Sequence, residues 1–207
     1  MKKLLFAAAA TLVLAGSAQA AGVTPTLDAV TPSGSNFEFI YNLTLDSDAG
    51  VRPGDGLIIY DFAGFVGFGA LPNPFIEATT ELTSTVSTDP DAFQPVPGFT
   101  DDPTVENLVF RWTGPLTFTE GEHPPIQFFL SAISTFSGIR SDGFTSLTVK
   151  NNGATAGQSL YAQGAVGVPV GAAIPEPGAW ALMIMGFGGL GAMLRRRNSR
   201  VASLTPA

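Results

Sequence analysis

The sequence predicts an all-β protein: a single antiparallel β-sandwich ectodomain followed by one short C-terminal transmembrane α-helix. Residues 36–46 alternate between apolar and polar side chains, which is the period of a half-buried strand. Segments rich in Gly, Pro, Asn and Asp interrupt the chain at short intervals, as turns between strands do. An uncharged apolar stretch at 178–194 lies directly before three arginines, which is the pattern of a membrane-spanning helix.

The strands can be placed by their residue patterns. In segment 36–46 one face carries Phe37, Phe39, Tyr41, Leu43 and Leu45. Residues 57–60 follow a Gly-Asp-Gly turn and are apolar throughout, which predicts a strand buried on both faces. Further strands are predicted at 76–86, 107–112, 126–136, 144–149 and 159–170. Seven to ten strands within residues 21–173 favour one sandwich, and about 150 residues suffice for one hydrophobic core.

The N-terminus has the pattern of a secretory signal peptide. Two lysines precede an uncharged apolar stretch from Leu4 to Ala15. Small residues at Ala18 and Ala20 fit the site that signal peptidase reads, so residues 1–20 are expected to be removed before Ala21. The twelve apolar residues are too few to span a bilayer. The sequence therefore predicts export.

The C-terminal stretch predicts a second membrane segment. Residues 178–194 would form a helix about 25 Å long, near the lower limit for crossing a hydrocarbon core. The arginines that follow are expected to stop transfer and to keep residues 198–207 in the cytoplasm; they are Arg195, Arg196 and Arg197. Residues 21–173 are then exposed outside an inner membrane that anchors the precursor.

Charge and composition exclude several functions. The chain has a net charge of −7, and its cations gather at the two ends. Between residues 21 and 174, four basic side chains face sixteen carboxylates, so this body repels nucleic acid phosphates. The absence of cysteine excludes disulfides and thiol catalysis.

The C-terminal residues carry a family resemblance. A Pro-Glu-Pro motif, a Trp-Ala pair two residues later, a glycine-rich apolar segment and an arginine cluster resemble the PEP-CTERM sorting signal in its PEP-x-x-WA form. The matching positions within residues 174–197 are Pro175, Glu176, Pro177, Trp180 and Ala181. The resemblance implies recognition and cleavage near this motif by an exosortase-type membrane protease. It also implies delivery to the cell surface or the medium in a Gram-negative bacterium that makes exopolysaccharide.

Parts of the body resemble a recurrent ectodomain type of PEP-CTERM proteins. The similar segments are Gly54-Asp55 with 59–64, then 101–103 with 107–108 and 113–115, and finally 164–169. This resemblance implies a β fold and brings no known activity with it.

Candidate chemistry is sparse. The single histidine, His123, stands between Glu122 and Pro124 in a predicted loop, and no nucleophile motif accompanies it, so no catalytic residue is assigned. Asp46 and Asp48, with Asp55 nearby, partly match the spacing of a calcium loop, but the distal glutamate is missing. Turn-forming acids are the competing interpretation. No other cofactor is expected.

The sequence thus indicates an exported, non-enzymatic structural or adhesive component of an exopolysaccharide or biofilm matrix. One alternative is a carbohydrate-binding module that contacts extracellular polysaccharide, for which the phenylalanines in 62–69 are candidates unless they belong to the core. A second alternative is an extracellular hydrolase, which would need two close carboxylates in a cleft, one with a raised pKa.

Overall fold

The computed structural model describes residues 22–171, except 72, 85, 88, 90 and 118–122, together with Met185 and Phe187. Apart from those two positions, the predicted signal peptide, the sorting signal and the tail lie outside the described residues. In the described part of the chain, no helix is both long and apolar enough to cross a membrane. The membrane span at 178–194 therefore stays a prediction.

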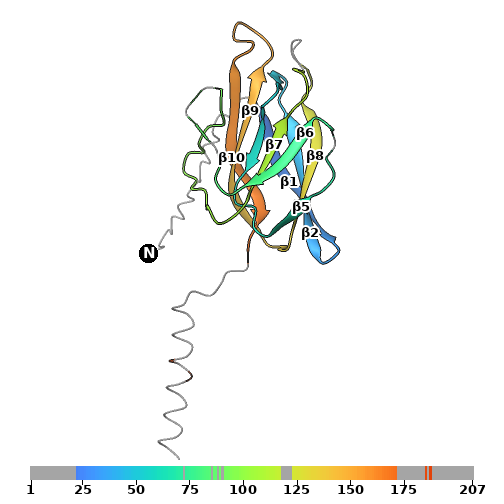
Figure 1. Cartoon of the computed structure of the whole chain (residues 1–207). Helices are drawn as coiled ribbons and strands as arrows, with labels where there is room; N and C mark the ends of the chain where they lie inside the picture. Colours follow the sequence, from blue (N-terminus) through green and yellow to red (C-terminus); the bar gives the residue numbers. More distant parts are fainter. Residues whose placement is uncertain are drawn as a thin grey trace, which may run out of the picture. The chain divides into compact units, whose positions relative to one another are not determined.

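The described body is all-β and forms two antiparallel sheets (Figure 1). The first sheet has the order β1 (Val23–Ser33), β2 (Asn36–Leu45), β8 (Ile126–Ser134) and β5 (Phe65–Phe68). The second has the order β10 (Ser159–Pro169), β9 (Ile139–Lys150), β4 (Gly56–Ile59), β7 (Asn107–Trp112) and β6 (Ile76–Glu81), and the short β3 (Ala49–Gly50) also pairs with β9. The predicted all-β class with antiparallel sheets is confirmed.

The main hydrophobic core lies between the two sheets. The predicted inward face of β2 supplies Phe39, Tyr41, Leu43 and Leu45, all buried, while Phe37 packs partly against the same cluster. Side chains from β4, β7, β9 and β10 complete the core from the second sheet. The alternation in the sequence therefore corresponds to a strand with one face buried against the opposite sheet.

A second cluster covers the outer face of the second sheet. Ile58, Val109 and Leu147 point to this side and pack with Tyr60 and Phe93. Phe93 belongs to the long connection between β6 and β7, which is folded over the sheet. The strand predicted at 57–60 is thus buried on both faces, as expected. Both clusters and every strand pairing lie within residues 22–171, so this body has a complete core and should fold by itself.

Three strands do not follow from the sequence pattern. β1 contains Pro25 and Pro32, and it lies at the edge of the first sheet, where proline is tolerated. β5 falls in the phenylalanine- and glycine-rich stretch 62–69, and β3 has only two residues. Phe62 is fully buried and makes an edge-to-face contact with Phe39. This stretch supplies side chains to the hydrophobic core. It is therefore not the exposed face for stacking on sugars that was the alternative interpretation of its phenylalanines.

Candidate functional site

The three acidic candidates for calcium binding each contact a different partner. Asp46 Oδ2 accepts a hydrogen bond from Gly22 N at 3.3 Å. Asp48 Oδ2 pairs with Lys150 Nζ at 3.0 Å. Asp55 is 1% exposed and pairs with Arg52. Within the described ranges, no group of three or more acidic, histidine or cysteine side chains could hold a metal ion.

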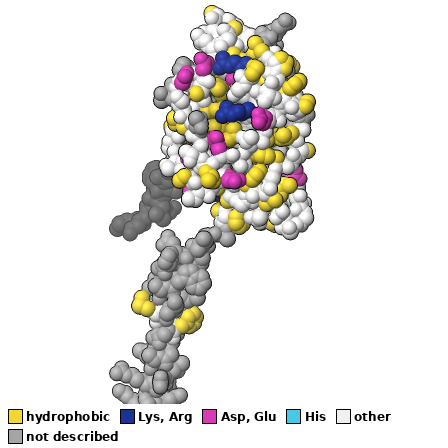
Figure 2. Space-filling view, viewed as in Figure 1, with side chains coloured by type: hydrophobic (Ala, Val, Ile, Leu, Met, Phe, Trp, Pro, Cys, Tyr) yellow, Lys and Arg dark blue, Asp and Glu magenta, His cyan; other side chains and the backbone are white. Residues whose placement is uncertain are grey.

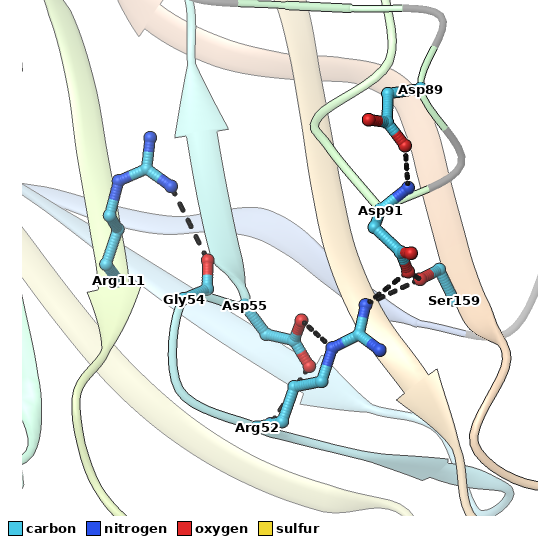
Figure 3. A network of polar contacts seen from close by, with 7 residues as sticks. All are labelled: Arg52, Gly54, Asp55, Asp89, Asp91, Arg111 and Ser159. Atoms are coloured by element: carbon cyan, nitrogen blue, oxygen red, sulfur yellow. Dashed lines mark hydrogen bonds and ion pairs between the residues drawn. The ribbon is translucent and has the colours of Figure 1, made fainter.

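Arg52 is the centre of a polar network that joins three segments (Figure 3). Its backbone N–H and Nε donate to the two Asp55 carboxylate oxygens at 2.9 and 3.1 Å. Its Nη2 donates to Asp91 and to the hydroxyl of Ser159, which in turn donates to Asp91 at 2.6 Å. Burial raises the pKa of Asp55 to about 6, although Arg52 favours its charged form. The network fastens the 52–55 turn to the β6–β7 connection and to β10.

A second cluster brings two buried carboxylates together. Arg140 Nη2 lies 3.4 Å from Asp61 Oδ2 and 3.0 Å from Asp142 Oδ2. Burial raises the pKa of Asp61 to about 6. The second oxygen of Asp61 accepts from Asp102 N, and Asp142 accepts from Gly143 N. Asp61 also has φ = 52°, in the left-handed region that non-glycine residues seldom adopt.

This pair partly meets the condition stated for a hydrolase, because two carboxylates are close and one has a raised pKa. Both side chains are nevertheless buried, and backbone N–H groups and one guanidinium already occupy them. The cavity beside Asp142 measures about 90 Å³, too little room for a sugar residue. The arrangement is better explained as a fixed link between the chain after β4 and the β6–β7 connection.

Asn107 joins the same link from the start of β7. It is fully buried, and its Oδ1 accepts from Asp61 N at 2.7 Å. Its Nδ2 donates to Ser84 Oγ at 3.0 Å and to Asp101 Oδ1 at 2.9 Å. One side chain thus joins the chain after β4 to two points of the β6–β7 connection, and both its Oδ1 and its Nδ2 are hydrogen-bonded. Neither Asn107 nor Arg140 stood out in the sequence, because the contact of each with Asp61 joins residues far apart along the chain.

An apolar cavity of about 250 Å³ lies between the two sheets. Its walls include Leu45, Leu57, Phe110, Ile126, Phe128 and Leu130. β5 pairs only with residues 132–134 of β8, and Gly69 N bonds Ser131 O. Among the described residues, the part of β8 from 126 to 130 has no strand neighbour on this edge. In the described part of the chain the first sheet is therefore incomplete at this edge, and Ile126, Phe128 and Leu130 from this part of β8 line the cavity.

An aromatic pair lies near this cavity. Phe75 and Trp112 have ring centroids 5.6 Å apart, and Phe75 is 45% exposed. Trp112 Nε1 donates to Pro115 O at 2.8 Å, which fixes the indole. A Cβ on Gly114 would come within 2.9 Å of both aromatic side chains, so this position requires glycine. These contacts form a rigid aromatic surface.

The remaining surface is mixed in character. Figure 2 shows Lys or Arg side chains lying beside Asp and Glu side chains, with hydrophobic side chains scattered between them. His123 contacts the carbonyl oxygens of Pro124 and Ala49 through its two ring nitrogens, in the loop before β8. Nothing in these contacts joins the histidine to a nucleophile.

The sites above define an all-β body with structural polar networks, one apolar cavity and one aromatic surface. The family model of the PEP-CTERM protein-sorting motif matches residues 173–197, as the sequence resemblance predicted. The chain therefore carries a PEP-CTERM sorting signal, which marks it as an exported protein that is sorted to the cell envelope by exosortase. No curated protein and no solved structure matches the chain.

The positions that carry this sorting role lie outside the described residues. They comprise the motif itself, the arginines after the apolar stretch and the predicted peptidase site at residues 18–21. Their roles in cleavage and in stopping transfer remain predictions.

Proposed function

We propose that the protein is a non-enzymatic structural or adhesive component of the exopolysaccharide or biofilm matrix of a Gram-negative bacterium. The sorting signal at residues 173–197 carries this proposal, because it directs the body outward past the membrane. The body also suits this role in two respects. Its buried carboxylates are engaged in links between segments, and its net negative charge keeps it soluble.

Processing at the motif provides the first test. We expect the mature protein to begin at Ala21 and to end near residues 175–177 when exosortase is present. Substituting Pro175 and Pro177 by alanine should leave the C-terminus full-length in membranes. Pro206→Ala, in the predicted tail, is the control that should be processed normally. Intact mass spectrometry of protein from medium and membranes gives the answer, and a full-length C-terminus with and without exosortase would contradict the proposal.

Carbohydrate binding is the second candidate function, and the Phe75–Trp112 pair favours it. Aromatic rings present a flat face to the C–H groups of a sugar ring, and the partial exposure of this pair leaves such a face accessible.

The prediction is that Trp112→Ala or Phe75→Ala weakens binding of the body to the bacterium's own polysaccharide about tenfold. Phe129→Ala removes a similarly exposed phenylalanine, 49% exposed, from β8 and serves as the control. Affinity electrophoresis in gels that contain the polysaccharide measures the effect. Equal retardation of all three variants would exclude this pair as the binding surface.

A further inference from the structure

We propose that the cavity between the two sheets is a binding site for an acyl chain, whose carboxyl or ester carbonyl is held by the side-chain amide of Asn73. The argument rests on the cavity's walls, its size, the amide donor of Asn73 and its position beside the part of β8 from 126 to 130. It does not depend on the proposed matrix role.

The walls exclude ligands that need many hydrogen bonds. Side chains from both sheets line the cavity, and they are almost all aliphatic or aromatic. Asp55 contributes to the lining, but both of its carboxylate oxygens accept from Arg52. Trp112 and Arg111 also contribute. Trp112 Nε1 is committed to Pro115 O, while the Arg111 guanidinium lies over the Phe93 ring and its Nη1 donates to Gly54 O at 3.4 Å. A sugar or a phosphate would therefore lose its water without gaining partners.

The cavity is large enough to take up an apolar ligand. Native interiors are densely packed, and few voids exceed one water molecule. This cavity has about 250 Å³. An apolar cavity of about 150 Å³ stays dry and takes up a benzene molecule. In the same proportion, a chain of about ten carbon atoms would fill this cavity. Water is disfavoured there, because such walls offer it few hydrogen-bond partners.

Asn73 supplies the polar anchor of the proposed site. It lines the cavity, and its Oδ1 accepts from Phe75 N at 2.9 Å. Its Nδ2 has no hydrogen-bond partner among the described residues. An amide N–H₂ donates to a carbonyl or carboxylate oxygen, so it selects a chain that ends in one. The incomplete edge at 126–130 of β8 gives such a chain a route between the sheets.

The test uses residues 22–171, which contain both hydrophobic clusters, and saturated fatty acids of six to fourteen carbons in isothermal titration calorimetry. Affinity should increase about fourfold for each added CH₂ group. It should stop increasing when the chain fills the cavity, near ten carbons. Methyl decanoate is compared with decanoate to separate an ester source from a free acid. Glucose, as a polar probe, should not bind at the cavity.

Cavity-filling variants make the test specific. Ile76→Trp places a larger ring in the lining and should weaken decanoate binding at least tenfold. Leu82→Trp, on an exposed position outside the lining, is the matched control and should bind as the wild type does. If thermal melts show that the Ile76 variant is unfolded, Val51→Ile fills part of the same cavity and should weaken binding several-fold.

The anchor has its own test. Asn73→Ala should weaken binding of decanoate about fivefold and leave binding of benzene, which has no carbonyl, unchanged. Two results would overturn the proposal: affinity that does not depend on chain length, or cavity-filling variants that fold and bind decanoate as the wild type does.

Discussion

Replacing Asn107 by alanine is expected to lower the free energy of unfolding by about 3 kcal/mol. The side chain is fully buried and makes three hydrogen bonds, to Asp61 N, Ser84 Oγ and Asp101 Oδ1. Its removal leaves the backbone N–H of Asp61 without an acceptor in a buried position, and such a group retains the full cost of its lost hydration. The loss should also loosen the connection between β6 and β7, because Ser84 and Asp101 belong to it.

Urea unfolding of residues 22–171 measures the first effect, and limited proteolysis between residues 82 and 106 measures the second. Gln163→Ala is the control, since it removes one exposed hydrogen bond to the same connection, from Gln163 Nε2 to Pro95 O. We expect that control to cost less than 1 kcal/mol. If both variants unfold at the same urea concentration, Asn107 does not have the role assigned here.

The main strands could be predicted because their burial has a simple period. The alternation in 36–46 and the continuous apolar run in 57–60 each follow from which faces of a strand are covered. β1 was missed for a physical reason. As an edge strand it can contain Pro25 and Pro32, and these residues read as a loop. Its pairing with β2 is a tertiary feature that no local pattern records.

The candidate sites were harder to predict because their residues meet only in three dimensions. The cavity exists because β5 pairs with just one end of β8, and that register cannot be read from either strand alone. Asn107 contacts Asp61, which is 46 residues away along the chain, and Ser84, which is 23 residues away. The pairing of Arg52 with Asp55 had a local signal, since the two residues flank Pro53 and Gly54 in a turn. Asp55 was instead a candidate calcium ligand, because a negatively charged side chain is compatible with that role as well.

Raising the pH from 5 to 7.5 is expected to destabilise the body, which is the opposite of the usual effect of buried ion-paired acids. The pKa of Asp55 and of Asp61 is raised from 3.8 to about 6 in the folded state, because burial disfavours the charged carboxylate. Between these values the folded state binds more protons than the unfolded state. The stabilisation that each protonated carboxyl group gives to the folded state is fully present below pH 3.8. It is lost as the pH rises through 6. Each group contributes on the order of 2 kcal/mol.

The free energy of unfolding in urea, measured at pH 5, 6 and 7.5, tests this expectation. All variants carry His123→Gln, so that the imidazole does not contribute to the difference. The double substitution Asp55→Asn with Asp61→Asn should remove most of the pH dependence in this window. Asp91 and Asp102 do not obscure the result, because hydrogen bonds from Ser159 and Thr104 lower their pKa, away from this window. Stability that is constant or increases from pH 5 to 7.5 would mean that Arg52 and Arg140 outweigh burial, and that the two networks hold their carboxylates charged.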